Sequence, residues 1–122
     1  MSEKRNILKN KSFYFAIRIV NLYKHLTKSK NEFVLSKQLL RSGTAIGALT
    51  REAQNAESKA DFVHKLAIAQ KECDETIYWI ELLHQTEFLS SVEFENIYVE
   101  ACEILKIIRS IIITTKHNIK KI

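Results

Sequence analysis

Apolar residues recur along most of the chain at spacings of three and four, the period of an α-helix with one buried face. The clearest stripe consists of Phe62, Leu66, Ala69, Cys73, Thr76, Ile80 and Leu83. A second stripe of the same spacing consists of Phe94, Ile97, Ala101, Ile104, Ile108, Ile111 and Thr115. These stripes predict amphipathic helices over residues about 59–86 and about 91–117.

The first half of the chain carries two further helical patterns of different character. In residues about 12–27, apolar side chains cover most of the helical wheel and leave a narrow polar strip of Arg18, Asn21 and His25. Residues about 36–54 carry a stripe with small members at its middle: Leu39, Gly43, Ile46, Thr50 and Ala53. Glycine costs roughly 1 kcal/mol relative to alanine inside a helix, so Gly43 and Gly47 predict close approach of another helix.

The starts of three helices are marked by side chains that accept hydrogen bonds from the first backbone N–H groups. Ser36 is a candidate N-cap, and Ser58 with Asp61 and Ser90 with Glu93 have the spacing of a capping box. The linkers between the four predicted helices are short, which favours antiparallel neighbours. We therefore predict an all-α, up-down-up-down four-helix bundle in which residues 1–122 form a single domain.

The composition agrees with long helices in a globular protein. The 122 residues include no proline and only two glycines, with 46% apolar and 27% charged residues. Charged residues interrupt every long apolar run, so we expect neither a membrane span nor a signal peptide. Cys73 and Cys102 occupy apolar helical positions, which predicts reduced core thiols in a cytoplasmic protein.

Charge is distributed unevenly along the chain, whose net charge is +5. Residues 1–41 contain ten basic and two acidic residues, and residues 104–122 contain five basic and no acidic ones. In the predicted bundle the first helix begins where the last one ends, so these charges meet at one pole. A basic pole can bind phosphate backbones without any sequence motif, although solvated chain ends would carry the same charges. The candidate nucleic-acid-binding residues are Lys4, Arg5, Lys9, Lys11, Arg51, Lys59, Lys116, Lys120 and Lys121.

Two carboxylates on the third predicted helix need a partner. Glu72 and Glu75 lie on a mostly apolar face, where an unpaired charge is costly. Arg41, on the neighbouring helix, is the candidate because its planar guanidinium suits a carboxylate in a half-buried setting. We expect Arg41 to form a structural ion pair with Glu72 or Glu75.

Two residue pairs resemble fragments of catalytic sites. Glu81 and His84 have the Glu-x-x-His spacing of di-iron bundles, but the sequence holds no second such pair. Arg18 and His25 loosely resemble the Arg-x(4-6)-His signature of ribonucleases with a helical-bundle fold, in which the motif lies late in the chain. Two solvated polar residues two turns apart on one strip explain the second pair better than a ribonuclease site does. We therefore predict no enzymatic activity, no metal and no cofactor.

A longer set of residues resembles a known family. These residues are Gln38 to Ala48, Arg51-Glu52-Ala53, Ala56-Glu57-Ser58, Asp61-Phe62, Lys71-Glu72, Glu75-Thr76 and Tyr78-Trp79. The set resembles the four-helix bundle proteins encoded in intervening sequences of bacterial 23S ribosomal RNA genes, to which the accessory proteins of diversity-generating retroelements are similar. The second and third predicted helices carry the resemblance, and the other two share only its pattern. Ala45 and Leu49 depart from it, since the family usually has Ser and Asn there.

The resemblance implies a homopentamer without known catalytic activity, and in the retroelement relatives it implies binding of nucleic acid and of a reverse transcriptase. The surplus apolar surface of the first and fourth predicted helices independently favours a homo-oligomer. Our first hypothesis is a self-associating bundle that binds RNA or DNA through its basic chain ends, without a membrane role. The second is a protein–protein interaction scaffold with a protein partner such as a reverse transcriptase, and the third is a ribonuclease that uses Arg18 and His25.

Overall fold

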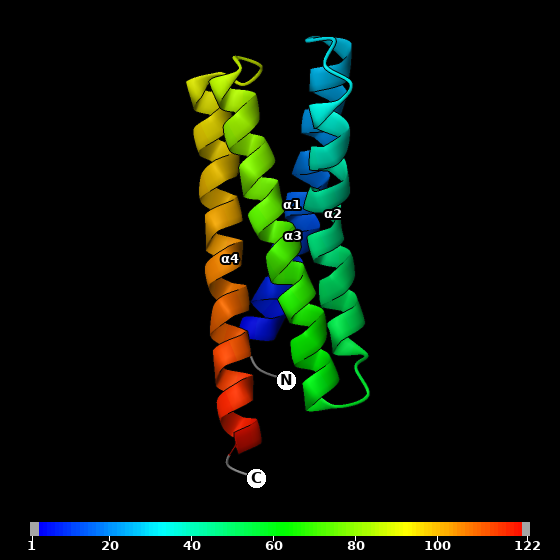
Figure 1. The fold of residues 1–122 in the computed structure, drawn as a ribbon, viewed down its shortest axis with the longest axis vertical. Coiled ribbons are helices and arrows are strands. Elements are labelled where there is room, and N and C mark those ends of the chain that lie inside the picture. The colour runs from blue at the N-terminus through cyan, green and yellow to red at the C-terminus, as the bar shows by residue number, and fades with distance from the viewer. Residues whose placement is uncertain (1–2, 121–122) are drawn as a thin grey trace.

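The computed structural model describes residues 3–120, and over that range the chain forms four antiparallel helices and no strand (Figure 1). They are α1 (Glu3–Lys28), α2 (Leu35–Gln54), α3 (Lys59–Gln85) and α4 (Ser91–Lys120). Each helix packs against the next one in the chain, and α4 packs back against α1. The predicted all-α, up-down-up-down bundle is therefore confirmed.

The apolar stripes read from the sequence form the core of the bundle. Every member of the α3 stripe from Phe62 to Leu83 is buried, and so is the α4 stripe from Ile97 to Thr115. Phe94, at the start of the α4 stripe, is only half-buried. Full burial of one large apolar side chain contributes about 1.5–3 kcal/mol, so these stripes are the main stabilising element. No helix within residues 3–120 is long and apolar enough to cross a membrane.

The first helix begins at Glu3, so the predicted start near Ser12 is wrong. The polar residues before Ser12 resemble a solvated tail when only the sequence is considered. In the bundle, however, Leu8 is completely buried two turns before Phe15 and extends the same apolar face. α4 also continues to Lys120, past the predicted end at residue 117.

The start of α2 is capped by a glutamate from the preceding loop, so the prediction of Ser36 as the N-cap is wrong. One carboxylate oxygen of Glu32 accepts hydrogen bonds from the backbone N–H groups of Val34 (3.3 Å) and Leu35 (3.0 Å), and the other accepts one from Ser36 (2.6 Å). Ser36 lies inside the helix, and its hydroxyl donates to the Glu32 carbonyl oxygen at 2.8 Å. Burial by itself would raise the pKa of Glu32, but the hydrogen bonds from Ser36, Leu35 and Val34 outweigh it and lower the pKa.

The other two helix starts follow the predicted caps. The backbone N–H of Asp61 donates to the Ser58 hydroxyl at 3.0 Å, while the Asp61 carboxylate accepts a hydrogen bond from the backbone of Glu57. At the start of α4 the pairing is reciprocal, because Glu93 N–H donates to the Ser90 hydroxyl and Ser90 N–H donates to the Glu93 carboxylate. Each arrangement satisfies backbone donors that a helix leaves without a partner in its first turn.

The two glycines of α2 allow α1 to approach closely, as their spacing predicts. A Cβ atom at Gly43 would lie 2.8 Å from Cγ1 of Ile19, and one at Gly47 would lie 3.2 Å from the backbone oxygen of Ser12. Both distances are shorter than ordinary van der Waals contact between these atoms. Close packing of α1 against α2 thus offsets the helix-propensity cost of the glycines.

The two cysteines are free, and we predict that they differ in reactivity. Cys73 is buried and Cys102 is partly buried. Burial, with a smaller contribution from the charge of Asp74, raises the pKa of Cys73 to about 12, which suppresses the reactive thiolate. We expect Ellman's reagent to modify Cys102 in the folded protein and Cys73 only after unfolding. A Cys102→Ser variant should lose the early reaction, and early reaction of that variant would contradict the assignment.

Candidate nucleic-acid interface

The predicted basic residues gather at the end of the bundle where α1 begins and α4 ends (Figure 1). Lys4, Arg5, Lys9 and Lys11 belong to the first turns of α1, and Lys116 and Lys120 to the last turns of α4. Arg51 precedes the end of α2 and Lys59 begins α3, so the connection between these helices lies at the same end. Lys121 lies outside the described residues.

Two of these basic residues are part of a polar contact between α1 and α4, which we call the α1–α4 seam. Along α1, a cationic or imidazole side chain recurs every seven residues, at Lys4, Lys11, Arg18 and His25. Positions seven apart lie on one helix face, as in the ion-paired positions of coiled coils. The contacts are Lys4 Nζ to Ser110 Oγ (2.6 Å), Lys11 Nζ to Glu103 Oε2 (3.0 Å), Arg18 to Glu100, and His25 Nε2 to Glu93 Oε2 (3.3 Å).

The seam offers a structural explanation for the spacing of Arg18 and His25. Each side chain faces a glutamate of α4, and a shallow groove of about 380 Å³ lies between them, lined also by Asn21 and Asn96. The structure therefore brings Arg18 and His25 to the same groove, as the ribonuclease hypothesis requires. However, each side chain is paired with a glutamate of α4, so both residues contribute to the packing of α1 against α4.

Two arginines of the candidate interface lie over aromatic rings. The guanidinium carbon of Arg5 is 4.0 Å from the centre of the Phe62 ring, and that of Arg51 is 5.1 Å from the centre of the Phe13 ring. Such cation–π contacts contribute about 0.5–1 kcal/mol at exposed sites. They also restrict where each charge points, so these arginines present their charges in defined positions.

The remaining lysines of the set are exposed and form no ion pair within residues 3–120. They are Lys9, Lys59, Lys116 and Lys120. Their ammonium groups can therefore neutralise phosphates without first breaking an internal contact.

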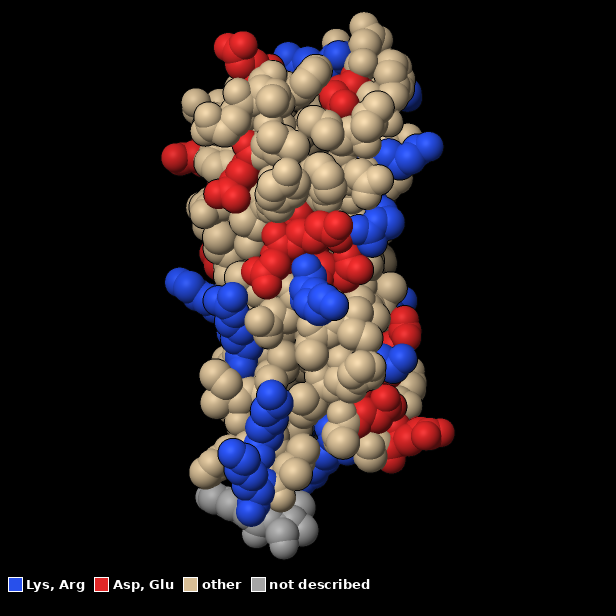
Figure 2. Space-filling view, viewed as in Figure 1, with Lys and Arg blue, Asp and Glu red and all other residues tan. Residues whose placement is uncertain are grey.

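The structure adds Lys106 and Arg109 to this surface, which the sequence interpretation omitted. Both are exposed on the face of α4 that also carries Lys116 and Lys120. Figure 2 shows basic side chains along the half of α4 that leads to its end. Arg109 has only a distant contact, 3.9 Å, with Asp74. The helical spacing of these four residues was readable from the sequence and could have identified them.

Acidic residues also lie at this end of the bundle. Glu3 belongs to the first turn of α1, and Glu57 is exposed between α2 and α3. Glu52 is paired with Lys65 at 3.3 Å. The basic surface is thus concentrated along α4 and the start of α1, and does not cover the whole end.

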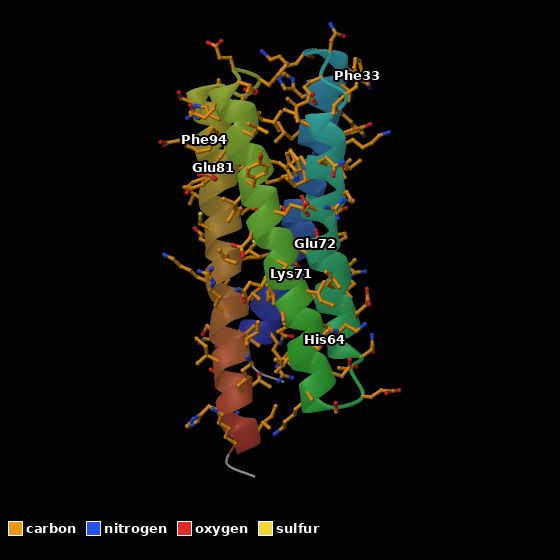
Figure 3. All side chains as sticks on the ribbon, viewed as in Figure 1. Phe33, His64, Lys71, Glu72, Glu81 and Phe94 are labelled. Carbon is orange, nitrogen blue, oxygen red and sulfur yellow. The ribbon has the colours of Figure 1, made fainter. Side chains whose placement is uncertain are left out.

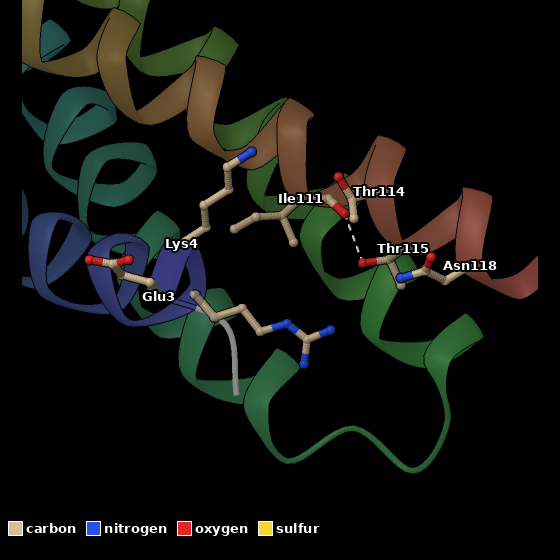
Figure 4. A pocket seen from close by; sticks show the side chains of 7 residues that line it. Glu3, Lys4, Ile111, Thr114, Thr115 and Asn118 are labelled. Carbon is tan, nitrogen blue, oxygen red and sulfur yellow. Dashed lines mark hydrogen bonds between the residues drawn. The ribbon is translucent and has the colours of Figure 1, made fainter.

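A groove of about 570 Å³, which we call the terminal groove, separates the start of α1 from the end of α4 (Figure 4). It is lined by Glu3, Lys4, Arg5, Ile111, Thr114, Thr115 and Asn118. The Thr115 hydroxyl donates to the Ile111 carbonyl oxygen at 2.7 Å and is thereby occupied. Side chains with ammonium, guanidinium, hydroxyl and amide donors therefore border one groove, while the carboxylate of Glu3 is directed away from Asn118 (Figure 4).

Arg41 lies between the two glutamates that the sequence suggested as its partners. Its Nη1 is 3.2 Å from Glu72 Oε1, and its Nη2 contacts the Glu75 carboxylate. Figure 3 shows Glu72 midway along α3, far from the basic end. The hydrogen bond from Arg41 lowers the pKa of Glu75. Half of the Arg41 side chain is exposed, as a half-buried setting implies, and solvent screening limits the contribution of the ion pair to at most about 1 kcal/mol.

The Glu81 and His84 pair packs against aromatic residues. The His84 ring stacks on Phe94, with 4.2 Å between ring centres and 14° between ring planes, and Phe94 stacks on Tyr98. Figure 3 shows Glu81 and Phe94 close to the same end of the bundle, opposite the basic end. Within the part of the chain that the structure describes, no group of His, Cys, Asp and Glu side chains could hold a metal ion.

Comparisons with known proteins place these features in context. Residues 4–110 match a family model described as 23S rRNA-intervening sequence protein. A crystal structure from Bacteroides thetaiotaomicron VPI-5482, described as a protein with unknown function from the S23 ribosomal protein family, is 55% identical. The match covers 89% of this chain and 97% of that chain, with a TM-score of 0.88. No curated protein matches this chain.

Proposed function

Because the chain belongs to the family of 23S rRNA-intervening sequence proteins, we propose that it is a non-enzymatic, homo-oligomeric scaffold that binds RNA or DNA through its basic end. The observation that carries the proposal is the exposure of Lys9, Lys59, Lys116 and Lys120 at one end of the bundle without internal ion pairs. We place this activity in the cytoplasm. Membership of this family confirms the resemblance that the sequence motifs of α2 and α3 carry.

Binding would be driven by the release of counterions from phosphates. Each neutralised phosphate frees condensed cations, which makes affinity depend steeply on salt and little on base sequence. Several copies in one assembly would present their basic ends together, and multivalent contact raises affinity without new chemistry. Lys and Arg contacts to the backbone position a nucleic acid and carry no direct sequence information.

Exposed apolar side chains support self-association. Ile7, Tyr14 and Ile17 on α1 and Val99 on α4 are all at least 40% exposed, and Tyr14 and Val99 line a shallow groove together with Lys11 of the α1–α4 seam. Burying apolar surface between copies would remove these side chains from water. We propose a pentamer, the assembly that the family resemblance implies. Light scattering should give five times the chain mass of 14.2 kDa, and a monomeric mass at micromolar concentration would contradict the assembly.

Salt-dependent binding is the decisive test of the proposed function. We expect fluorescence anisotropy with labelled RNA or DNA to show affinity that falls steeply as salt rises. The double variant Lys116→Gln/Lys120→Gln should reduce the slope of log affinity against log salt by about two, because two phosphate contacts are lost. The matched control is Lys24→Gln/Lys28→Gln, which makes the same charge change on exposed lysines at the opposite end. Equal losses in both double variants would contradict a localised interface.

The second candidate function is a protein-binding scaffold, favoured by two apolar side chains at the other end of the bundle. Phe33 and Val34, in the loop before α2, are 59% and 71% exposed, and Figure 3 shows Phe33 at that end. Adjacent exposed apolar side chains are typical of protein contact sites. Absence of nucleic-acid binding even at low salt would support this function in place of the first.

A further inference from the structure

The terminal groove contains donors that the fold leaves available. Lys4 Nζ donates one hydrogen bond to Ser110 Oγ, which leaves two further N–H donors on the ammonium. The Thr114 hydroxyl and the Asn118 amide are exposed and make no side-chain hydrogen bond within residues 3–120. The side chains come from α1 on one side and α4 on the other, as Figure 4 shows for Lys4 and Asn118.

The two cations of the groove are held in place before any ligand arrives. Ser110 fixes the Lys4 ammonium at 2.6 Å, and the Phe62 ring lies under the Arg5 guanidinium at 4.0 Å. Ile111 is buried and provides an apolar wall beside them. Donors that are already ordered lose less conformational entropy when they bind, which favours a specific contact over a diffuse one.

This set of donors fits a phosphate group. Phosphate oxygens accept several hydrogen bonds at once, and charge-assisted bonds from Lys and Arg are the strongest of these. The volume of about 570 Å³ lies in the range of ligand sites, about 300–1,000 Å³, and leaves room for more than the phosphate alone. Glu3 is also a lining residue, and although Figure 4 shows its carboxylate directed away from Asn118, the negative charge close to the groove disfavours additional negative charge. A phosphodiester, with one negative charge, suits the groove better than a free nucleotide with a doubly charged phosphate.

We propose that the terminal groove binds one nucleotide of a polynucleotide, with Lys4 and Arg5 on its phosphodiester and Thr114 and Asn118 as neutral donors. The inference rests on the proposed nucleic-acid function and identifies a defined contact within it. The lysines along α4 supply charge outside the groove, while the groove holds one phosphate between two helices.

Variants of opposite sign within the groove test the proposal, with a short labelled single-stranded RNA as the probe. Lys4→Gln should weaken binding about threefold to tenfold and reduce the salt slope by about one. Asn118→Asp should also weaken binding, because it adds a negative charge with almost no change in size. Glu3→Gln should strengthen binding about twofold to threefold, because it removes the repelling carboxylate. Circular dichroism melting checks that each variant is folded. If Lys4→Gln destabilises the protein because it loses its contact with Ser110 on α4, Asn118→Asp provides the independent test of the groove.

Matched controls separate a groove effect from a change in net charge. Glu57→Gln removes a carboxylate at the same end but outside the groove, and Gln85→Glu adds one at the opposite end. Both controls should leave the affinity nearly unchanged. If Glu57→Gln strengthened binding as much as Glu3→Gln, the groove assignment would be overturned.

The outcomes also distinguish the groove from the proposed function. Suppose that Lys116→Gln/Lys120→Gln weakens RNA binding, while Lys4→Gln, Asn118→Asp and Glu3→Gln leave it unchanged. That result would overturn the groove proposal and leave the proposed nucleic-acid function intact. Absence of RNA binding by the unmodified protein at low salt would overturn both. Adenosine monophosphate serves as a second probe, and we expect it to displace the RNA only weakly. Strong displacement would overturn the preference for a phosphodiester.

Discussion

Replacing Gly43 with alanine should destabilise the bundle by about 1–3 kcal/mol, although alanine is the better helix former. The new Cβ atom would lie 2.8 Å from Cγ1 and 2.9 Å from Cγ2 of Ile19. Ile19 is completely buried, and its β-branched side chain is restricted to few rotamers, so it cannot turn away from the new methyl group. Urea unfolding at a fixed protein concentration measures the loss, with the m-value as a check on two-state behaviour.

A double-mutant cycle shows whether the contact with Ile19 is the cause. Ile19→Ala removes both clashing atoms and by itself costs about 2–5 kcal/mol through the cavity it leaves. In the double variant the Gly43→Ala penalty should shrink by at least about 1 kcal/mol. Gly47→Ala is the comparison variant, because its Cβ would lie 3.2 Å from the Ser12 backbone oxygen, a less severe overlap than at Gly43. A more stable Gly43→Ala variant would mean that helix propensity outweighs packing.

Loss of the Glu32 carboxylate should destabilise the protein by about 1–3 kcal/mol. Glu32→Ala leaves the backbone N–H groups of Val34, Leu35 and Ser36 without their acceptor, and Ser36 is buried. Glu32→Gln keeps one side-chain oxygen and should cost less. The free energy of unfolding of the two variants gives the comparison, and equal stability of Glu32→Ala and the unmodified protein would exclude a capping role.

The same carboxylate should make stability depend on pH. Its pKa in the folded protein lies below the ordinary value of 4.5, so the ionised form is the one that stabilises the fold. Its contribution is therefore complete above the ordinary pKa and is lost as the pH falls through the lowered folded pKa. We expect the stability difference between the unmodified protein and Glu32→Gln to narrow in acid. Glu95→Gln, an exposed glutamate without a partner in residues 3–120, should show no such narrowing.

Much of the fold was predictable because its signals are local or periodic. Burial of Phe62 through Leu83 follows from spacing alone, and the caps at Ser58 and Ser90 follow from hydrogen bonds within one helical turn. The sequence does not reveal the start of α1 because the residues around Leu8 are mostly polar, and Leu8 is buried only once the other three helices pack around it. The Glu32 cap was missed because the acceptor precedes the helix and reaches its first N–H groups through a loop.

For the candidate interface, the sequence alone identified the basic end, because an antiparallel four-helix topology brings the chain ends together. Which of those charges remain available depends on packing between residues distant in the chain. Lys11 contacts Glu103, Arg51 lies over Phe13, and neither pairing has a sequence signal. The terminal groove likewise exists only where α1 and α4 meet. Periodicity and capping are properties of a single segment, whereas a side chain's partners are set by the geometry of neighbouring helices.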